Sequence, residues 1–114
     1  MNTVLENLQK ARELITPPEK WCVGSFEDNG ARCALGALFH VKKGHDRENW
    51  RAEYNCMPEA LALEAALPRR HRPKRYCTHE NVACYNNSHT HDTVLKWFDR
   101  AIAIQKEHPT EKVG

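Results

Sequence analysis

An apolar segment at residues 33–38, which has the sequence Cys-Ala-Leu-Gly-Ala-Leu, constrains the fold more than any other part of this chain. Phe39 and Val41 extend it before two lysines and a glycine follow. A helix that is apolar on nearly every face has to be covered by other elements. Lysines followed by glycine are typical of a helix C-terminus, where positive charge complements the helix dipole. We therefore predict a central, well-covered helix at 32–43.

Three further segments have the periodicity of helices that can cover this one. Residues 3–15 place apolar side chains at offsets of three and four, and Thr3 and Glu6 have the spacing of a capping box. Residues 58–67 begin with proline, a residue favoured in the first turn, and are rich in Ala and Leu. Residues 91–107 carry an apolar stripe, so we predict helices in all three segments.

Proline and glycine mark the turns between these helices. The residue before a proline is disfavoured in the α region, so Pro17-Pro18 should end the first helix. Asn29-Gly30 can close a short hairpin between 21–26 and 31–34. We favour a simple loop at 19–30 instead, because the residues that follow are helical.

Together these patterns predict a mostly α fold. The chain has 114 residues, which suits one domain. We expect a small single-domain helical bundle of about four helices with long irregular loops, with a short β-hairpin near 21–34 as an option. Weaker patterns suggest short helices at 45–56 and 79–86, the second followed by a break at Asn-Asn-Ser. The domain should span 1–107, followed by a polar tail at 108–114.

Composition excludes several classes of protein. Hydrophobic residues make up 40% of the chain and the net charge is only +2, which does not fit a disordered chain. No apolar run approaches the ~18 residues of a membrane span. Residues 1–6 lack the basic and apolar regions of a secretory signal, so we expect a cytoplasmic protein without membrane partners. Its five cysteines should then be thiols.

One group of residues has the types needed for nucleophilic catalysis. Cys33 lies near the start of a predicted helix, where the dipole would lower the pKa of a thiol. His91 or His89 could act as a base and Asn86 or Asn87 could orient it, as in Cys-His-Asn hydrolases. The alternative is that Cys33 is a packed core residue, which we favour, so we lean against an enzyme.

Cysteine and histidine are dense between residues 77 and 91. Cys77, His79, Cys84 and His89 are of the types that bind zinc, which takes four such ligands in a tetrahedron. Their spacing matches none of the standard zinc patterns. We therefore expect no cofactor, and keep zinc as the alternative.

Positive charge is concentrated in a run at residues 69–75. Five of the seven residues are basic, whereas the rest of the chain has 12 basic and 15 acidic residues. Such runs bind partners through charge, and contacts to nucleic-acid phosphates are one way. Aromatic residues for stacking bases are nearly absent here, so we expect a protein partner, with phosphate contacts as the alternative. The candidate binding residues are Arg69, Arg70, Arg72, Lys74 and Arg75.

Five motifs follow one another along the chain: Trp21-Cys22-x-Gly24, the Cys-Ala-Leu-Gly-Ala-Leu block, Tyr85-Asn86-Asn87, Thr90-His91-x-x-Val94-Leu95 and Asp99-Arg100-Ala101-Ile102. In this order they resemble a family of small uncharacterised domains from bacteria and bacteriophages. The resemblance covers most of residues 4–104. The family tends to have Trp-Asn-Asp where this chain has Tyr85-Asn86-Asn87. No activity comes with the resemblance.

The resemblance implies that its shared residues form one cluster, consisting of Trp21, Cys33, Gly36, Asn86, Thr90 and His91. We expect Thr90 to cap the last helix and His91 to reach the loop around Trp21. The function we expect is that of a non-enzymatic phage or bacterial accessory protein that binds a macromolecular partner. The alternatives are a small enzyme that uses Cys33 and His91, or a zinc-stabilised nucleic-acid-binding module.

Overall fold

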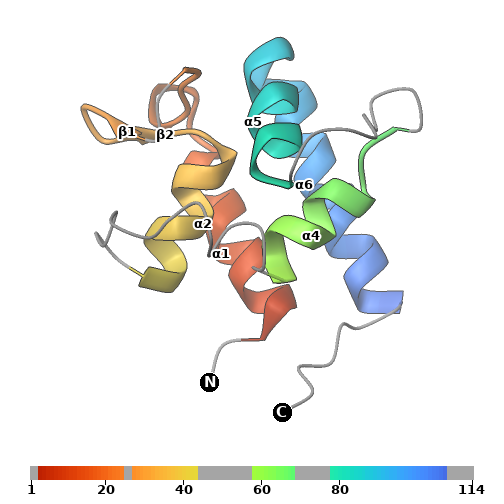
Figure 1. The fold of residues 1–114 in the computed structure, drawn as a ribbon. Helices are drawn as coiled ribbons and strands as arrows, with labels where there is room; N and C mark the ends of the chain where they lie inside the picture. Colours follow the sequence, from red (N-terminus) through yellow and green to blue (C-terminus); the bar gives the residue numbers. More distant parts are fainter. Residues whose placement is uncertain (1–2, 25–26, 44–57, 69–77, 108–114) are drawn as a thin grey trace.

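A computed structural model describes residues 3–24, 27–43, 58–68 and 78–107 of the chain. Within these ranges the fold is mostly α, as predicted, with five α-helices and a small hairpin (Figure 1). The elements are α1 (Val4–Ile15), the 3-10 turn η1 (Pro18–Lys20), β1 (Glu27–Asp28), β2 (Ala31–Arg32), α2 (Ala34–Lys43), α4 (Pro58–Ala65), α5 (Thr78–Ser88) and α6 (His91–Glu107).

Helix α2 is the central helix that the apolar segment predicts. Every side chain from Cys33 to Phe39 that has a β-carbon is at most 5% exposed. Helices α1, α4 and α5 all contact α2. The prediction of a well-covered central helix is therefore confirmed, and the hydrophobic effect of burying this segment holds the other helices around it.

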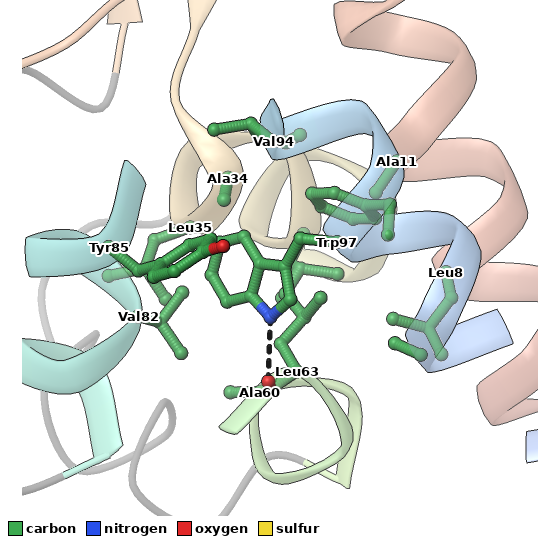
Figure 2. Packing of buried hydrophobic residues seen from close by; sticks show 14 of the residues in the cluster. Leu8, Ala11, Ala34, Leu35, Ala60, Leu63, Val82, Tyr85, Val94 and Trp97 are labelled. Atoms are coloured by element: carbon green, nitrogen blue, oxygen red, sulfur yellow. Dashed lines mark hydrogen bonds between the residues drawn. The ribbon is translucent and has the colours of Figure 1, made fainter. Parts of the chain in front are cut away.

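The core is organised around Trp97 of α6. Figure 2 shows its ring between Tyr85 and Val82 of α5, Leu63 of α4 and Leu35 of α2. Its indole Nε1 donates to the main-chain oxygen of Leu63 at 2.8 Å, so the polar atom of this buried ring has a partner. One side chain thus joins α6 to three other helices.

Helix α1 begins with the predicted capping box. Thr3 Oγ1 accepts from the main-chain N–H of Glu6, and Glu6 Oε1 accepts from that of Thr3. The helix ends at Ile15, just before Pro17-Pro18, as predicted. Thr16, which precedes a proline, still has α-helical dihedral angles, and Pro17 is the first extended residue. The steric restriction takes effect at Pro17 because Pro18 follows it.

The segment before α2 forms a hairpin, so our preference for a simple loop was wrong. Strands β1 and β2 pair antiparallel over two residues each, which is shorter than the 21–26 and 31–34 hairpin considered above. Asn29 and Gly30 both have positive φ, at 52° and 87°. Two successive positive φ values are what a tight hairpin turn with the twist of its strands requires.

Helix α5 runs through the Asn-Asn-Ser sequence that we expected to be a break, since Ser88 is its last residue. Helix α6 then starts after a short turn. Thr90 caps it as predicted, because Thr90 Oγ1 accepts from the main-chain N–H of Thr93 at 3.2 Å. The two helices are therefore separated by only two residues.

Three of the predicted segments lie outside the described residues: the short helix at 45–56, the basic run at 69–75 and the tail at 108–114. Across the part of the chain that the structure describes, none of the helices has the length and apolar character needed to cross a bilayer.

Candidate functional site

The carboxamide of Asn86 is the centre of a polar cluster in which α5 meets the start of α2 and the loop after η1. Asn86 is 0% exposed. Its Oδ1 accepts from Trp21 Nε1 at 2.8 Å and from the main-chain N–H of Ala34 at 3.1 Å. Its Nδ2 donates to the main-chain oxygen of Cys22 at 3.2 Å and to Asn87 Oδ1 at 3.1 Å. All four bonds that an asparagine amide can make are used, so this buried group is fully satisfied.

Asn87 continues the cluster toward the surface. Its Oδ1 also accepts from the main-chain N–H of Gly24 at 2.9 Å. Gly24 has a φ of 81°, which a residue with a β-carbon rarely adopts. The pair Asn86 and Asn87 therefore holds the loop Trp21–Gly24 in place by its main chain. We call Trp21, Cys22, Ala34, Asn86 and Asn87 the Asn86 cluster.

His91 joins the same end of the molecule from the first turn of α6. Its Nε2 lies 2.6 Å from the main-chain oxygen of Ile15, the last residue of α1. A carbonyl can only accept, so this nitrogen carries the proton. The His91 ring also lies against Trp21, with 5.4 Å between the ring centroids. His91 thus reaches Trp21, and it also anchors the end of α1.

The thiol of Cys33 is buried, with 4% of the residue exposed. Burial raises its pKa to about 11, although the N–H of Gly36, which lies 3.4 Å from Sγ, acts in the opposite direction. The expectation that the helix start lowers this pKa was wrong, because removing the thiolate from water outweighs the favourable N–H groups. At neutral pH the thiol is therefore protonated, and a protonated thiol is a poor nucleophile.

The three candidates for catalysis lie in one region but are not arranged as a nucleophile, a base and an orienting residue. Asn86 bonds to Trp21 and Ala34 rather than to His91. The Nε2 of His91 is bound to the oxygen of Ile15. Among the described residues, no hydrogen bond joins Cys33 to His91. Asn86 and His91 instead each hold two elements of the fold together, and the Cys33 thiol accepts from Gly36 within the start of α2.

The metal candidates are only partly covered by the described residues. Cys84 is exposed on α5. His89 lies just after α5, where its ring stacks on Tyr85 at 3.9 Å and its Nδ1 is 2.9 Å from the oxygen of Tyr85. Cys77 and the side chain of His79 are outside the described set. Within that set, no three Cys, His, Asp or Glu side chains converge on a point where a metal could bind.

Sequence reasoning missed a buried carboxylate that joins α1 to α4. Glu59 is 1% exposed, and its Oε2 accepts from Asn7 Nδ2 at 2.8 Å. A second such pair, Glu64 with Asn81 at 2.5 Å, joins α4 to α5. The available signal was the position of Asn7, which lies on the apolar face of the first helix beside Leu8. A polar side chain at such a position needs a partner.

One surface depression, of about 450 Å³, lies between α1 and α2. It is lined by Lys10, Glu13, Leu14, His40 and Val41. None of the candidate residues from the sequence lines it. Its mixture of charged and apolar side chains indicates no particular ligand.

Comparison with known proteins identifies a family and adds no activity. Searches of curated proteins and of solved structures found no match to this chain. One family model does match, over residues 1–104, which include all the residues of the Asn86 cluster and end three residues before the end of α6. The chain therefore belongs to this family of unknown function, DUF6197.

Proposed function

We propose that this protein is a non-enzymatic accessory protein of a bacterium or bacteriophage that binds an acidic protein partner through the basic run at residues 69–75. The observation that carries the proposal is the concentration of charge. Arg69, Arg70, Arg72, Lys74 and Arg75 follow one another within seven positions, while the rest of the chain has three more acidic than basic residues. Local charge of one sign steers and selects a partner of the opposite sign.

The place of the run in the chain also supports this proposal. The run follows Pro68, directly after the turn that ends α4, and α5 begins at Thr78. Both helices contact each other, and they are joined by the Glu64–Asn81 hydrogen bond. The two ends of the basic segment are therefore attached to a common, packed support.

The chemistry of the Asn86 cluster favours a structural role over catalysis. The polar side chains of Asn86, Asn87 and His91 are used to hold main-chain groups of other elements. The Cys33 thiol is buried with a raised pKa. A catalytic nucleophile needs access to a substrate and a pKa near the working pH, and the buried Cys33 thiol has neither feature.

Binding of defined polyanions by the full chain tests the proposal. Fluorescent poly-L-glutamate serves as a model of an acidic protein surface, and a random-sequence DNA duplex serves as the nucleic acid. Binding of both is titrated at about 50 and 200 mM salt. We expect poly-L-glutamate to bind, with an affinity that falls as salt increases. Replacing the five basic residues by glutamine should abolish this binding.

A matched variant distinguishes an effect of the basic run on binding from an effect of net charge. Glutamine at Lys10, Lys20, Lys96, Arg100 and Lys106 also removes five positive charges, all from exposed residues. This variant should keep at least half of the wild-type affinity. Equal losses in both variants would refute a localised site. Tighter binding of the DNA duplex, lost only with the run, would replace the protein partner by nucleic acid.

A further inference from the structure

Two thiols that no proposed function uses are placed as neighbours by the main chain. Trp21 and Arg32 form an isolated parallel β-bridge, and the N–H of Cys22 donates to the oxygen of Arg32 at 3.2 Å. In a parallel pair, successive residues stay in register and side chains of a pair point to the same face. Cys22 and Cys33 are the next pair in this register.

The spacing of such a pair suits a disulfide. Neighbouring extended segments lie about 4.8 Å apart. Disulfides join residues whose Cα atoms are roughly 4.4–6.8 Å apart. The Asn86 amide fixes this spacing from a third element, because its Nδ2 bonds to the oxygen of Cys22 and its Oδ1 to the N–H of Ala34, the residue after Cys33.

The two thiols differ in access. Neither is part of a disulfide, and Cys22 is half-buried while Cys33 is buried. Burial raises the pKa of Cys33, and the N–H of Gly36 acts in the opposite direction. The nearby thiol of Cys22 raises this pKa further. An oxidant from solution can thus reach Cys22 first, and Cys33 lies beside it as the thiol that reacts second.

We propose that Cys22 and Cys33 are the oxidisable site of this protein and form an intramolecular disulfide when they react with a low-molecular-weight disulfide such as oxidised glutathione. The ring it closes contains the β1–β2 hairpin and joins the loop after η1 to the residue directly before α2. Oxidation therefore joins the loop at Cys22 to the start of the central helix by a covalent bond.

The reaction proceeds in two exchange steps. The Cys22 thiolate attacks one sulfur of oxidised glutathione, and one glutathione leaves as a thiolate that takes up a proton. The Cys33 thiol then loses its proton to solvent, and its thiolate attacks the sulfur of Cys22. The second glutathione leaves and is protonated. In total two protein thiols lose two electrons and two protons, and one glutathione disulfide becomes two glutathione thiols.

Peptide mapping of the full chain tests this directly. The native protein is treated with oxidised glutathione, the remaining thiols are blocked with iodoacetamide, and the protein is digested with trypsin. Cleavage after Lys20, Arg32 and Lys42 places the two cysteines on separate peptides, 21–32 and 33–42. We expect these two peptides to be joined in most of the molecules that carry any disulfide.

Two serine variants provide the controls. Cys22→Ser should abolish the joined peptides, and serine keeps the main-chain hydrogen bonds of this position to Arg32 and Asn86. Cys84→Ser removes an exposed cysteine elsewhere and should leave the yield unchanged. A disulfide to another cysteine, a glutathione adduct that persists on Cys22, or two unreacted thiols while Cys84 reacts would each overturn the proposal.

The pH dependence of the second step gives an independent readout. Because Cys33 has to ionise, the rate at which the glutathione adduct on Cys22 is converted to the disulfide should rise about tenfold per pH unit from pH 7.5 to 9.5. A rate that is flat over this range would show that Cys33 is not the resolving thiol.

Discussion

Replacing Asn86 by alanine should destabilise the protein more than any other single polar substitution in the Asn86 cluster. The substitution removes the acceptor of the Ala34 N–H, which is fully buried, and of Trp21 Nε1, which is half-buried. It also removes the donor to the oxygen of Cys22. A buried polar group that loses its partner costs about 1–3 kcal/mol.

The expected magnitude follows from the burial of each group. The Ala34 N–H cannot reach water and contributes the full cost, whereas Trp21 and Cys22 are partly solvated and together contribute about 2 kcal/mol. Asn86→Ala should therefore lower the free energy of unfolding by roughly 3–5 kcal/mol, a large part of the 5–15 kcal/mol of a typical domain. Urea unfolding followed by circular dichroism measures this change.

Asn87→Ala is the matched control. Because Asn87 is exposed, this substitution should lower the free energy of unfolding by under about 1 kcal/mol. If Asn86→Ala does not fold, Trp21→Phe tests the same reasoning, because it removes one donor and should cost about 1–2 kcal/mol. Equal effects at Asn86 and Asn87, or a loss below 1 kcal/mol at Asn86, would refute the role given to the buried amide.

Three further predictions follow from individual groups. Hydrogen bonds to Thr3 hold the pKa of Glu6 below its usual 4.5. This pair therefore stabilises the fold above pH 4.5, and its contribution is lost as the pH falls through the lowered pKa. In Glu6→Gln, the urea concentration at the unfolding midpoint should therefore fall less steeply at acidic pH than in the wild type. Burial raises the pKa of Cys33 from 9.0 to about 11, so its contribution is present below pH 9 and lost as the pH rises through 11. Under reducing conditions, the stability difference between wild type and Cys33→Ala should therefore change by about 2–3 kcal/mol over that range, and no change would contradict the burial of the thiol. In the Arg12–Asp99 pair, Nε lies 2.6 Å and Nη2 3.1 Å from the two carboxylate oxygens, and both side chains are partly exposed. A double-mutant cycle should give a coupling free energy of about 0.5–1 kcal/mol, and this coupling should be smaller in high salt.

The helices were predictable where a local pattern and the tertiary fold agree. The segment at 33–39 is apolar on all faces and lies at the centre of the fold. Thr3 and Glu6 form the capping box that their spacing predicts. Such features depend on residues a few positions apart, which a sequence displays directly.

The remaining features depend on contacts between distant residues. Asn86 and Asn87 favour turns by themselves, yet they lie in the last turn of α5 because their amides bond to the loop Trp21–Gly24. The pKa of Cys33 follows from how deeply other helices cover it. Neither the depth of burial nor the identity of a partner some 60 residues away can be read from local spacing.

The hydrogen bonds of the Asn86 cluster and His91 also determine when this end of the molecule can be completed during synthesis. Asn86 bonds to Trp21 across 65 positions, and His91 bonds to Ile15 across 76. A nascent chain that ends before α5 has already made α1, the hairpin and the start of α2, but it lacks the side chains of Asn86, Asn87 and His91 that bond to them. Because domains close non-local contacts last, the N-terminal half should leave the ribosome with its loop Trp21–Gly24 still open to chaperones and proteases.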